Sequence, residues 1–174
     1  VLDRTAFYPE GGGQPADHGM LGGAKIIDVR EKEGVILHTC DKALTVGETV
    51  TGTIDWDRRF DHMQQHSGEH MVSGIICARY GCDNVGFHLG SDDVTLDFNG
   101  VLTREQWDDI ETEANRVVAA CLPIKAYYPA PNELAAMTYR SKLDLTENVR
   151  MVEIGEDGAC DRCACCAPHV NNTG

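Results

Sequence analysis

Two pairs of metal-binding residue types most constrain how this chain folds. His66 and His70 lie four residues apart inside a segment that we expect to be helical. Residues at this spacing stand on one face of a helix, one turn apart. Cys165 and His169 repeat the spacing near the other end of the sequence. Because zinc prefers four ligands drawn from His, Cys and carboxylate, we expect the fold to bring both pairs to one ion.

The number of ligands stays open at this point. A catalytic zinc site keeps one position for water. If His66, His70, Cys165 and His169 all bind, water or substrate must enter as a fifth ligand or displace one of them. If only three bind, the fourth is able to orient a water molecule. Cys166 is a substitute ligand, but Cys165 keeps the four-residue step to the histidine.

Two other interpretations of these motifs are weaker. Cys160 and Cys163 form a Cys-x-x-Cys step, but a zinc ribbon needs a second such step, and Cys77 with Cys82 has the wrong spacing. With Glu69, the histidine pair formally matches the His-x-x-Glu-His motif of zinc proteases, whose carboxylate is a general base. A Ser-Gly pair inside the motif and a cysteine ligand are unlike those proteases, so we do not favour peptide cleavage.

Length and composition allow one sizeable domain or two small ones, since the chain has 174 residues and 42% hydrophobic content. We see no apolar run of about 18 residues and no secretory signal, so we expect no membrane span and a cytoplasmic protein. Four of the eight cysteines crowd into residues 160–166, which indicates metal binding or reduced thiols rather than a disulfide framework. The sequence begins in mid-pattern without Met, and we interpret it as a piece of a longer protein.

Residues 1–55 are predicted to form a small β-barrel. Short runs of strand-forming residues at 24–29, 35–38 and 48–54 are separated by turn residues. From residue 56 onward, helices and strands alternate, which indicates a two-layer α+β domain over 56–174. The expected elements there are a helix over 57–79, a hairpin over 85–98, a helix from Thr103 to about Cys121, a strand over 124–128, a short helix over 131–137 and a strand over 149–154.

Two further features allow a structural or a functional interpretation. Gly11, Gly12 and Gly13 cannot form a strand interior or a stable helix, so they are either a flexible hairpin or a loop that a ligand or neighbouring domain approaches closely. No Gly-Lys-Ser/Thr follows, so this is not a phosphate loop. His88 precedes a turn. It is either an exposed hairpin histidine or a residue that points toward the metal site and contacts substrate.

Taken together, the motifs resemble one family. The chain resembles the editing domain of alanyl-tRNA synthetases and its free-standing relatives, the AlaX-type alanyl-tRNA editing proteins. The Ser-Gly-Glu between the two histidines is more similar to the free-standing proteins. Cys-Ala-Pro replaces the common Gly-Gly-Thr between the last two ligands, which keeps their spacing but alters the backbone. The matching stretches, in the family's order, are residues 2–17, 65–70, 86–90, 149–154 and 165–170.

The resemblance implies an α+β fold, with a glycine-rich β-barrel subdomain over 1–55 and a zinc-binding, two-layer α/β editing domain of the threonyl/alanyl-tRNA synthetase type over 56–174. It implies ATP-independent hydrolysis of the ester in mischarged tRNA(Ala), chiefly Ser-tRNA(Ala), with Gly-tRNA(Ala) as a second candidate. The implied zinc ligands are His66, His70, Cys165 and His169. Zinc either polarises the attacking water or anchors the substrate while a separate water attacks.

The resemblance also implies roles for individual side chains. Thr5 is expected to hydrogen-bond the seryl hydroxyl, so that an alanyl ester leaves this polar group unpaired and is rejected. The implied substrate contacts are Thr5, Gly11, Gly12, Gly13, Gln14 and His88, and the implied catalytic residues are His66, His70 and His88. A second hypothesis, from another class, is a non-catalytic zinc or tRNA-docking module of a larger synthetase-related protein. Retention of Thr5, the glycine-rich loop and all four ligands favours the enzyme. No oligomeric state is predicted.

The net charge of −13 conflicts with a tRNA partner, whose phosphates attract Lys and Arg. Basic residues nevertheless group in two places: Arg58 with Arg59, and Arg140 with Lys142 and Arg150. They are either a local strip that contacts tRNA or ordinary solvated charges. A domain outside this sequence is the alternative source of most of the RNA affinity.

Overall fold

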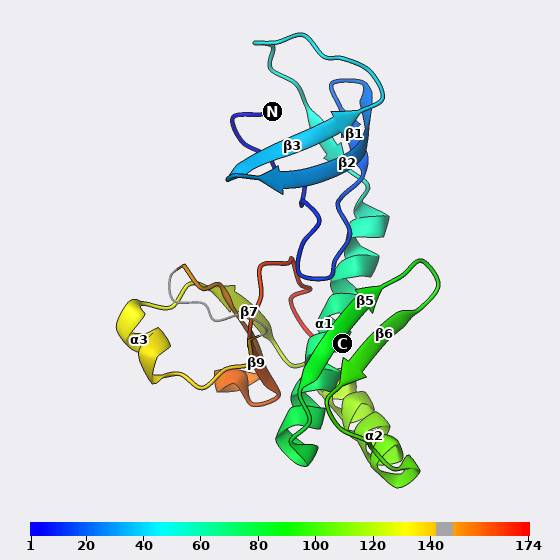
Figure 1. Cartoon of the computed structure of the whole chain (residues 1–174), viewed down its shortest axis with the longest axis vertical. Helices are drawn as coiled ribbons and strands as arrows, with labels where there is room; N and C mark the ends of the chain where they lie inside the picture. The colour runs from blue at the N-terminus through cyan, green and yellow to red at the C-terminus, as the bar shows by residue number, and fades with distance from the viewer. Residues whose placement is uncertain (142–147) are drawn as a thin grey trace.

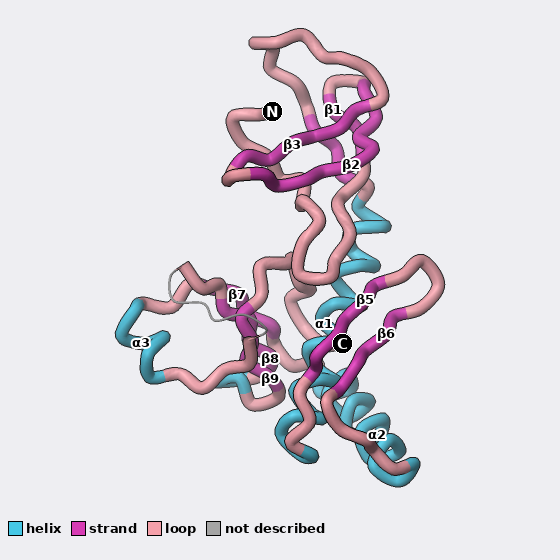
Figure 2. The backbone as a smooth tube through the Cα atoms, viewed as in Figure 1, coloured by secondary structure: helices cyan, strands magenta, loops and turns pink. Residues whose placement is uncertain are grey.

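The computed structural model of the protein describes residues 1–141 and 148–174, and it is a mixed α/β fold with several antiparallel sheets (Figure 1, Figure 2). No helix in these two ranges is long and apolar enough to cross a membrane. In chain order the elements are β1 (Gly19–Leu21), β2 (Ala24–Lys32), β3 (Val35–Cys40), β4 (Gly52–Ile54), α1 (Trp56–Tyr80), β5 (Asn84–Leu89), β6 (Val94–Phe98), α2 (Arg104–Ala120), β7 (Ile124–Tyr127), α3 (Pro131–Ala136), β8 (Met151–Ile154), a single 3₁₀ turn (Glu156–Gly158) and β9 (Asp161–Ala164).

The N-terminal part is one antiparallel sheet with strand order β3-β2-β1-β4. A register shift between Ile26 and Asp28 inserts an extra residue into β2, so Val29 returns to the buried face that Ile26 also occupies. Phe7, Leu21 and these two side chains share a small core. Within residues 1–55, all of which are described, β3 and β4 do not pair with each other. Closure into a barrel therefore stays a prediction.

Helix α1 is the element around which the rest is arranged. Its start is fixed by Asp55, whose side chain accepts a hydrogen bond from the backbone N–H of Arg58. Its end is fixed by Gly81 at φ 64°, in the left-handed conformation that glycine adopts without a steric penalty. The prediction of a helix over 57–79 is confirmed to within one residue at each end. In Figure 1, α1 runs from the N-terminal sheet down between the β5–β6 hairpin and the β7–β9 sheet.

The strands after α1 form two separate antiparallel sheets, β5-β6 and β7-β8-β9, and both contact α1. A second core lies between α1, α2 and β8, where Ile76, Val152 and Ile154 are fully buried. The predicted capping box is confirmed, since Thr103 and Gln106 exchange hydrogen bonds at the start of α2. Strand β9 falls in the segment that the sequence indicated only as a cysteine-rich tail. The domain division at residue 55 stays a prediction, although the two cores are distinct.

Candidate metal centre and its cavity

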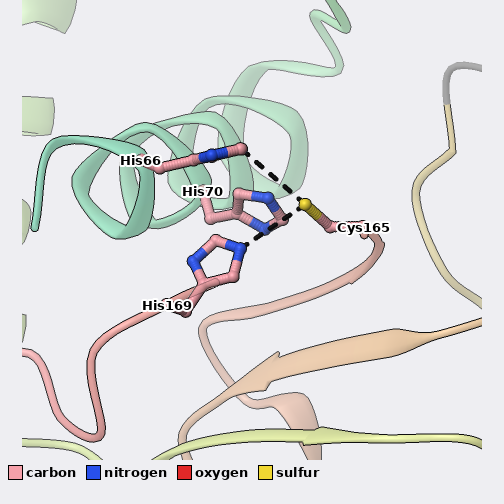
Figure 3. Close-up of side chains that lie close together, drawn as sticks. All are labelled: His66, His70, Cys165 and His169. Carbon is pink, nitrogen blue, oxygen red and sulfur yellow. Dashed lines mark hydrogen bonds between the residues drawn. The ribbon is translucent and has the colours of Figure 1, made fainter. Parts of the chain in front are cut away.

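The structure brings the two predicted ligand pairs together (Figure 3). The metal-binding atoms of His66, His70, Cys165 and His169 all lie within 4.8 Å of one another. The Cys165 Sγ is 3.7 Å from Nε2 of His66 and 3.5 Å from Nε2 of His169. Helix α1 supplies two of the rings, while the chain after β9 supplies the thiol and the third ring. Three imidazoles and one thiol are a donor set that suits zinc.

In each of the three histidines, the Nδ1 atom has an oxygen partner outside the group of four residues. This arrangement holds Nδ1 away from the centre and turns Nε2 toward it, as outer partners of metal-bound histidines commonly do. The partners come from three different parts of the fold: the N-terminal loop, α1 and β9. The contacts are His66 Nδ1 to Gln14 Oε1 at 3.0 Å, His70 Nδ1 to Asp161 Oδ2 at 3.2 Å and His169 Nδ1 to Ser67 Oγ at 3.0 Å.

The Ser67 contact fixes the tautomer of His169. The Ser67 hydroxyl donates its hydrogen to the carbonyl of Met63 at 2.7 Å, and the backbone N–H of Val170 donates to the same hydroxyl oxygen at 3.3 Å. A hydroxyl has one hydrogen to give, so Ser67 must accept a hydrogen from His169 Nδ1. The Nε2 lone pair of His169 therefore faces Cys165. Burial, together with the charges of His70 and His66, holds the pKa of His169 far below its usual value, so the ring is neutral, as metal binding requires.

Asp161 joins one of the candidate metal ligands, His70, to the partly buried Arg140. Its carboxylate accepts hydrogen bonds from Arg140 at 2.7 and 2.8 Å as well as the one from His70. Burial disfavours the charged carboxylate, but the bonds from His70 and Arg140 outweigh it and lower the pKa of Asp161. Burial likewise disfavours a protonated His70, but hydrogen bonds with Asp161 and Cys165 outweigh it and raise the pKa of His70 to about 9. Asp161 thus orients His70 electrostatically as well as sterically.

The competing cysteines are less suited to bind the ion. Cys163 falls in a second possible group with His70 and Asp161, but Asp161 already bonds both His70 and Arg140. Burial raises the pKa of Cys163 to about 12 and that of Cys160 to about 11, which keeps both thiols protonated. Cys166 is exposed and lies outside both groups, 3.6 Å from the Tyr8 hydroxyl. The geometry thus favours Cys165.

The glycine-rich segment is a tight turn pressed against the centre. Gly11 and Gln14 exchange backbone hydrogen bonds at 3.1 and 2.9 Å, and Gly13 between them has φ 83°. A Cβ atom on Gly13 would lie 2.4 Å from the ring of Phe87 in β5. Both interpretations of the glycines therefore apply: the segment is a hairpin, and a neighbouring part of the fold approaches it closely. Gln14 itself is fully buried beside His66 and does not line the cavity described below.

Arg58 and Arg59 fasten this N-terminal loop to α1. Arg59 forms a two-nitrogen ion pair with the buried carboxylate of Asp17, and it also donates to the carbonyl of Ala6 at 2.8 Å. Arg58 donates to the carbonyl of Ala16 at 2.6 Å. These two arginines were expected to contact tRNA or solvent. In the structure both side chains are partly buried and hold the chain against itself, and their contact with tRNA stays a prediction.

The second group of basic residues is used in the same way. Arg140 is paired with Asp161, and Arg150 donates to the carbonyls of Cys165 and Ala167 at 2.9 and 2.8 Å. Lys142 lies outside the described residues. The four described arginines of the expected tRNA strip therefore stabilise the loops that carry the centre.

A cavity of about 680 Å³ opens beside the four residues, with His66, His70 and Cys165 in its wall. This volume is typical of small-molecule sites. Phe87 and Tyr128 supply aromatic surface, and the ring centroid of Phe87 is 4.9 Å from that of His66.

Of the predicted substrate contacts, Gly12 and Gly13 line the cavity, whereas Gly11, Gln14, His88 and Thr5 do not. His88 is exposed and does not line the cavity, while its neighbour Phe87 does, because successive side chains of a strand point to opposite faces. The Thr5 hydroxyl bonds Nε2 of His38 at 2.8 Å and accepts from the backbone of Phe7 at 3.1 Å, so it belongs to the N-terminal sheet. Thr5 is also absent from the lining of the cavity. Its contact with a seryl hydroxyl stays a prediction that this placement does not favour.

Sequence reasoning missed several residues that surround the centre. Gln14 was expected to contact substrate, but in the structure it contacts His66, one of the candidate metal ligands. The roles of Ser67, Asp161 and Phe87 were not foreseen. The position of Phe87 could have been inferred, because successive residues of the predicted strand point to opposite faces, so either Phe87 or His88 had to face the centre. Asp161 had none, because nothing in the sequence pairs it with a residue in α1.

Comparisons with known proteins agree with the motifs. Residues 1–58 match the family model described as tRNA synthetases class II (A). The chain is 37% identical to the alanyl-tRNA editing protein AlaX-M of Methanosarcina barkeri, with 99% of this chain and 77% of that protein covered. It is 34% identical to AlaX-L of Pyrococcus horikoshii and 35% identical to the alanine–tRNA ligase of Ignicoccus hospitalis. It spans 44% and 20% of the lengths of these two proteins.

Proposed function

The chain belongs to the AlaX-type alanyl-tRNA editing proteins, and on that premise we propose that it hydrolyses the ester of mischarged tRNA(Ala) at a zinc site. Ser-tRNA(Ala) is the proposed main substrate and Gly-tRNA(Ala) the second. The observation that carries the proposal is the group of three histidines and one cysteine beside a cavity of about 680 Å³. All three rings have their Nδ1 atoms engaged, which leaves three Nε2 atoms and one thiol directed at a common point.

The residues that would hold zinc are His66, His70, Cys165 and His169. A bound zinc ion would supply Lewis-acid polarisation of a carbonyl or of water. The chain's own part is to fix the donors: Gln14, Asp161 and Ser67 each hold one imidazole in a single orientation.

The cavity wall then limits what reaches the donors. Phe87 gives this wall an aromatic ring against His66, on which one side of a bound ester would pack. An aminoacyl ester is already activated, so orientation and polarisation are sufficient for useful rates.

Deacylation of Ser-tRNA(Ala) by the zinc-loaded chain tests this function, with Ala-tRNA(Ala) as the correctly charged control. We expect rapid release of serine, slow release of alanine, and loss of activity in the His66→Ala variant. A matched control is His18→Ala, since His18 is not a predicted site residue and does not line the cavity.

A zinc-loaded chain that leaves Ser-tRNA(Ala) intact would refute the proposal. Such a result, combined with retained zinc binding, would instead favour the non-catalytic zinc or tRNA-docking module.

A further inference from the structure

A buried carboxylate beside the metal centre has no part in the scheme above. Glu69 precedes His70 in α1, is 6% exposed and lines the cavity. Its Oε2 atom is 3.7 Å from Nε2 of His70, the nitrogen that faces the other donors. The carboxylate therefore lies at the junction between the centre and the space that a substrate would occupy.

The other carboxylate oxygen of Glu69, Oε1, is held by two hydrogen-bond donors. Ser73 and Asn84 both donate hydrogen bonds to Oε1 at 2.8 Å, and Asn84 also donates to the Ser73 hydroxyl at 2.9 Å. All three residues are buried. Because Oε1 receives two donors from α1 and β5, the plane of the carboxylate cannot rotate freely, and Oε2 is held toward the centre.

The described part of the chain provides no arginine or lysine as an ion-pair partner for Glu69. The two nearest candidates in the cavity wall are used elsewhere: Arg140 bonds Asp161, and Arg150 bonds backbone carbonyls. The Glu69 carboxylate is buried in the cavity wall, so an ammonium group that enters the cavity gains from pairing with it.

We propose that Glu69 binds the α-ammonium group of the aminoacyl ester. This rests on the proposed function, whose substrate carries that group on the carbon next to the ester carbonyl. A carbonyl at the metal centre therefore brings the ammonium beside Oε2. The ammonium then gives a charge-assisted hydrogen bond to the carboxylate. The site selects esters of amino acids with a free amino group and disfavours esters whose nitrogen is acylated.

Two substrates and one isosteric variant test the assignment. Ser-tRNA(Ala) and N-acetyl-Ser-tRNA(Ala) are hydrolysed by the wild-type chain, by Glu69→Gln and by a control, Glu111→Gln, whose side chain is exposed on α2. Glutamine keeps an oxygen that accepts from Ser73 and Asn84 while it removes the charge. We expect kcat/KM for Ser-tRNA(Ala) to fall about 10- to 100-fold in Glu69→Gln, as for the loss of one charged hydrogen bond, with no change for the acetylated substrate.

A binding measurement separates this inference from the proposed function. Calorimetry with an unreactive amide analogue, 3′-serylamino-3′-deoxyadenosine, and with its N-acetyl form does not depend on hydrolysis. We expect the free amine to bind wild type about 10- to 100-fold more tightly than Glu69→Gln, and the acetylated form to bind both equally. Zinc content is measured on every sample and is expected to stay at the wild-type level in Glu69→Gln.

Equal losses on both substrates would overturn the assignment, since they would mean that Glu69 acts on the attacking water or supports the metal ligands. So would loss of zinc from Glu69→Gln, or equal affinity of wild type and variant for the free amine. If the wild-type chain fails to hydrolyse Ser-tRNA(Ala), the proposed function fails, and the calorimetric comparison still decides whether Glu69 recognises the amine.

Discussion

Replacing Gln14 by leucine tests whether the N-terminal loop controls the metal centre. In the wild-type chain, Gln14 is fully buried and its Oε1 atom accepts from His66 Nδ1 at 3.0 Å. Leucine has a similar size but cannot accept this hydrogen bond. His66 then loses the contact that directs its Nε2 atom toward the other ligands. Loss of such a partner typically weakens metal binding by 10- to 100-fold, or about 1.4 to 2.7 kcal/mol.

The free energy of unfolding of the metal-free chain should change much less. Leucine takes the acceptor away from the buried Nδ1 atom of His66, which costs about 1 to 3 kcal/mol. Against this, Gln14 Nε2 is buried without a partner in the described residues, and removal of such a group restores about 1 to 3 kcal/mol. The two effects nearly cancel. We therefore expect a selective loss of metal affinity with almost unchanged metal-free stability.

Competition with a chromophoric zinc chelator measures the affinity, and urea unfolding of the metal-free protein measures the stability. Gln65→Leu is the matched control, because it makes the same change at an exposed position of α1, next to His66. Unchanged zinc affinity in Gln14→Leu would refute the reasoning. A loss of metal-free stability above about 3 kcal/mol would also refute it, since the cancellation would then be wrong.

Three further outcomes are expected. Removal of zinc by a chelator should lower the midpoint of thermal unfolding, because an ion that binds only the folded chain stabilises it. Re-addition of zinc should restore the midpoint, and an unchanged midpoint would exclude a resident metal. Gly13→Ala should destabilise the chain by about 1 to 3 kcal/mol in urea, since φ is positive there and the new methyl group would meet Phe87. Wild-type stability of this variant would mean that the loop is mobile. Thr5→Val should leave the ratio of the hydrolysis rates of Ser-tRNA(Ala) and Ala-tRNA(Ala) unchanged, because the Thr5 hydroxyl bonds His38. A changed ratio would support the contact between Thr5 and the seryl hydroxyl that was predicted from the sequence.

Local patterns were a sound guide to local structure. The apolar spacing predicted α1, and the Thr103–Gln106 pair predicted the start of α2. The hairpin over 85–98 is confirmed as β5 and β6. Each of these features depends on residues a few positions apart, so the sequence contains the whole signal. Barrel closure depends instead on how the distant edges β3 and β4 meet, and it is not seen in residues 1–55.

The sequence by itself indicated which residue types the centre contains, because it shows two pairs of His or Cys at steps of four residues. The helical step places His66 beside His70 in α1, whereas Cys165 and His169 lie in an irregular segment after β9, where the tertiary fold sets their positions. Only the tertiary structure decided what surrounds them. Gln14 reaches His66 across 52 positions and Asp161 reaches His70 across 91, and no local pattern encodes contacts over such separations. The same holds for the arginines: their charge is visible in the sequence, but whether a guanidinium meets solvent, RNA or a buried Asp17 depends on which distant segment lies against it.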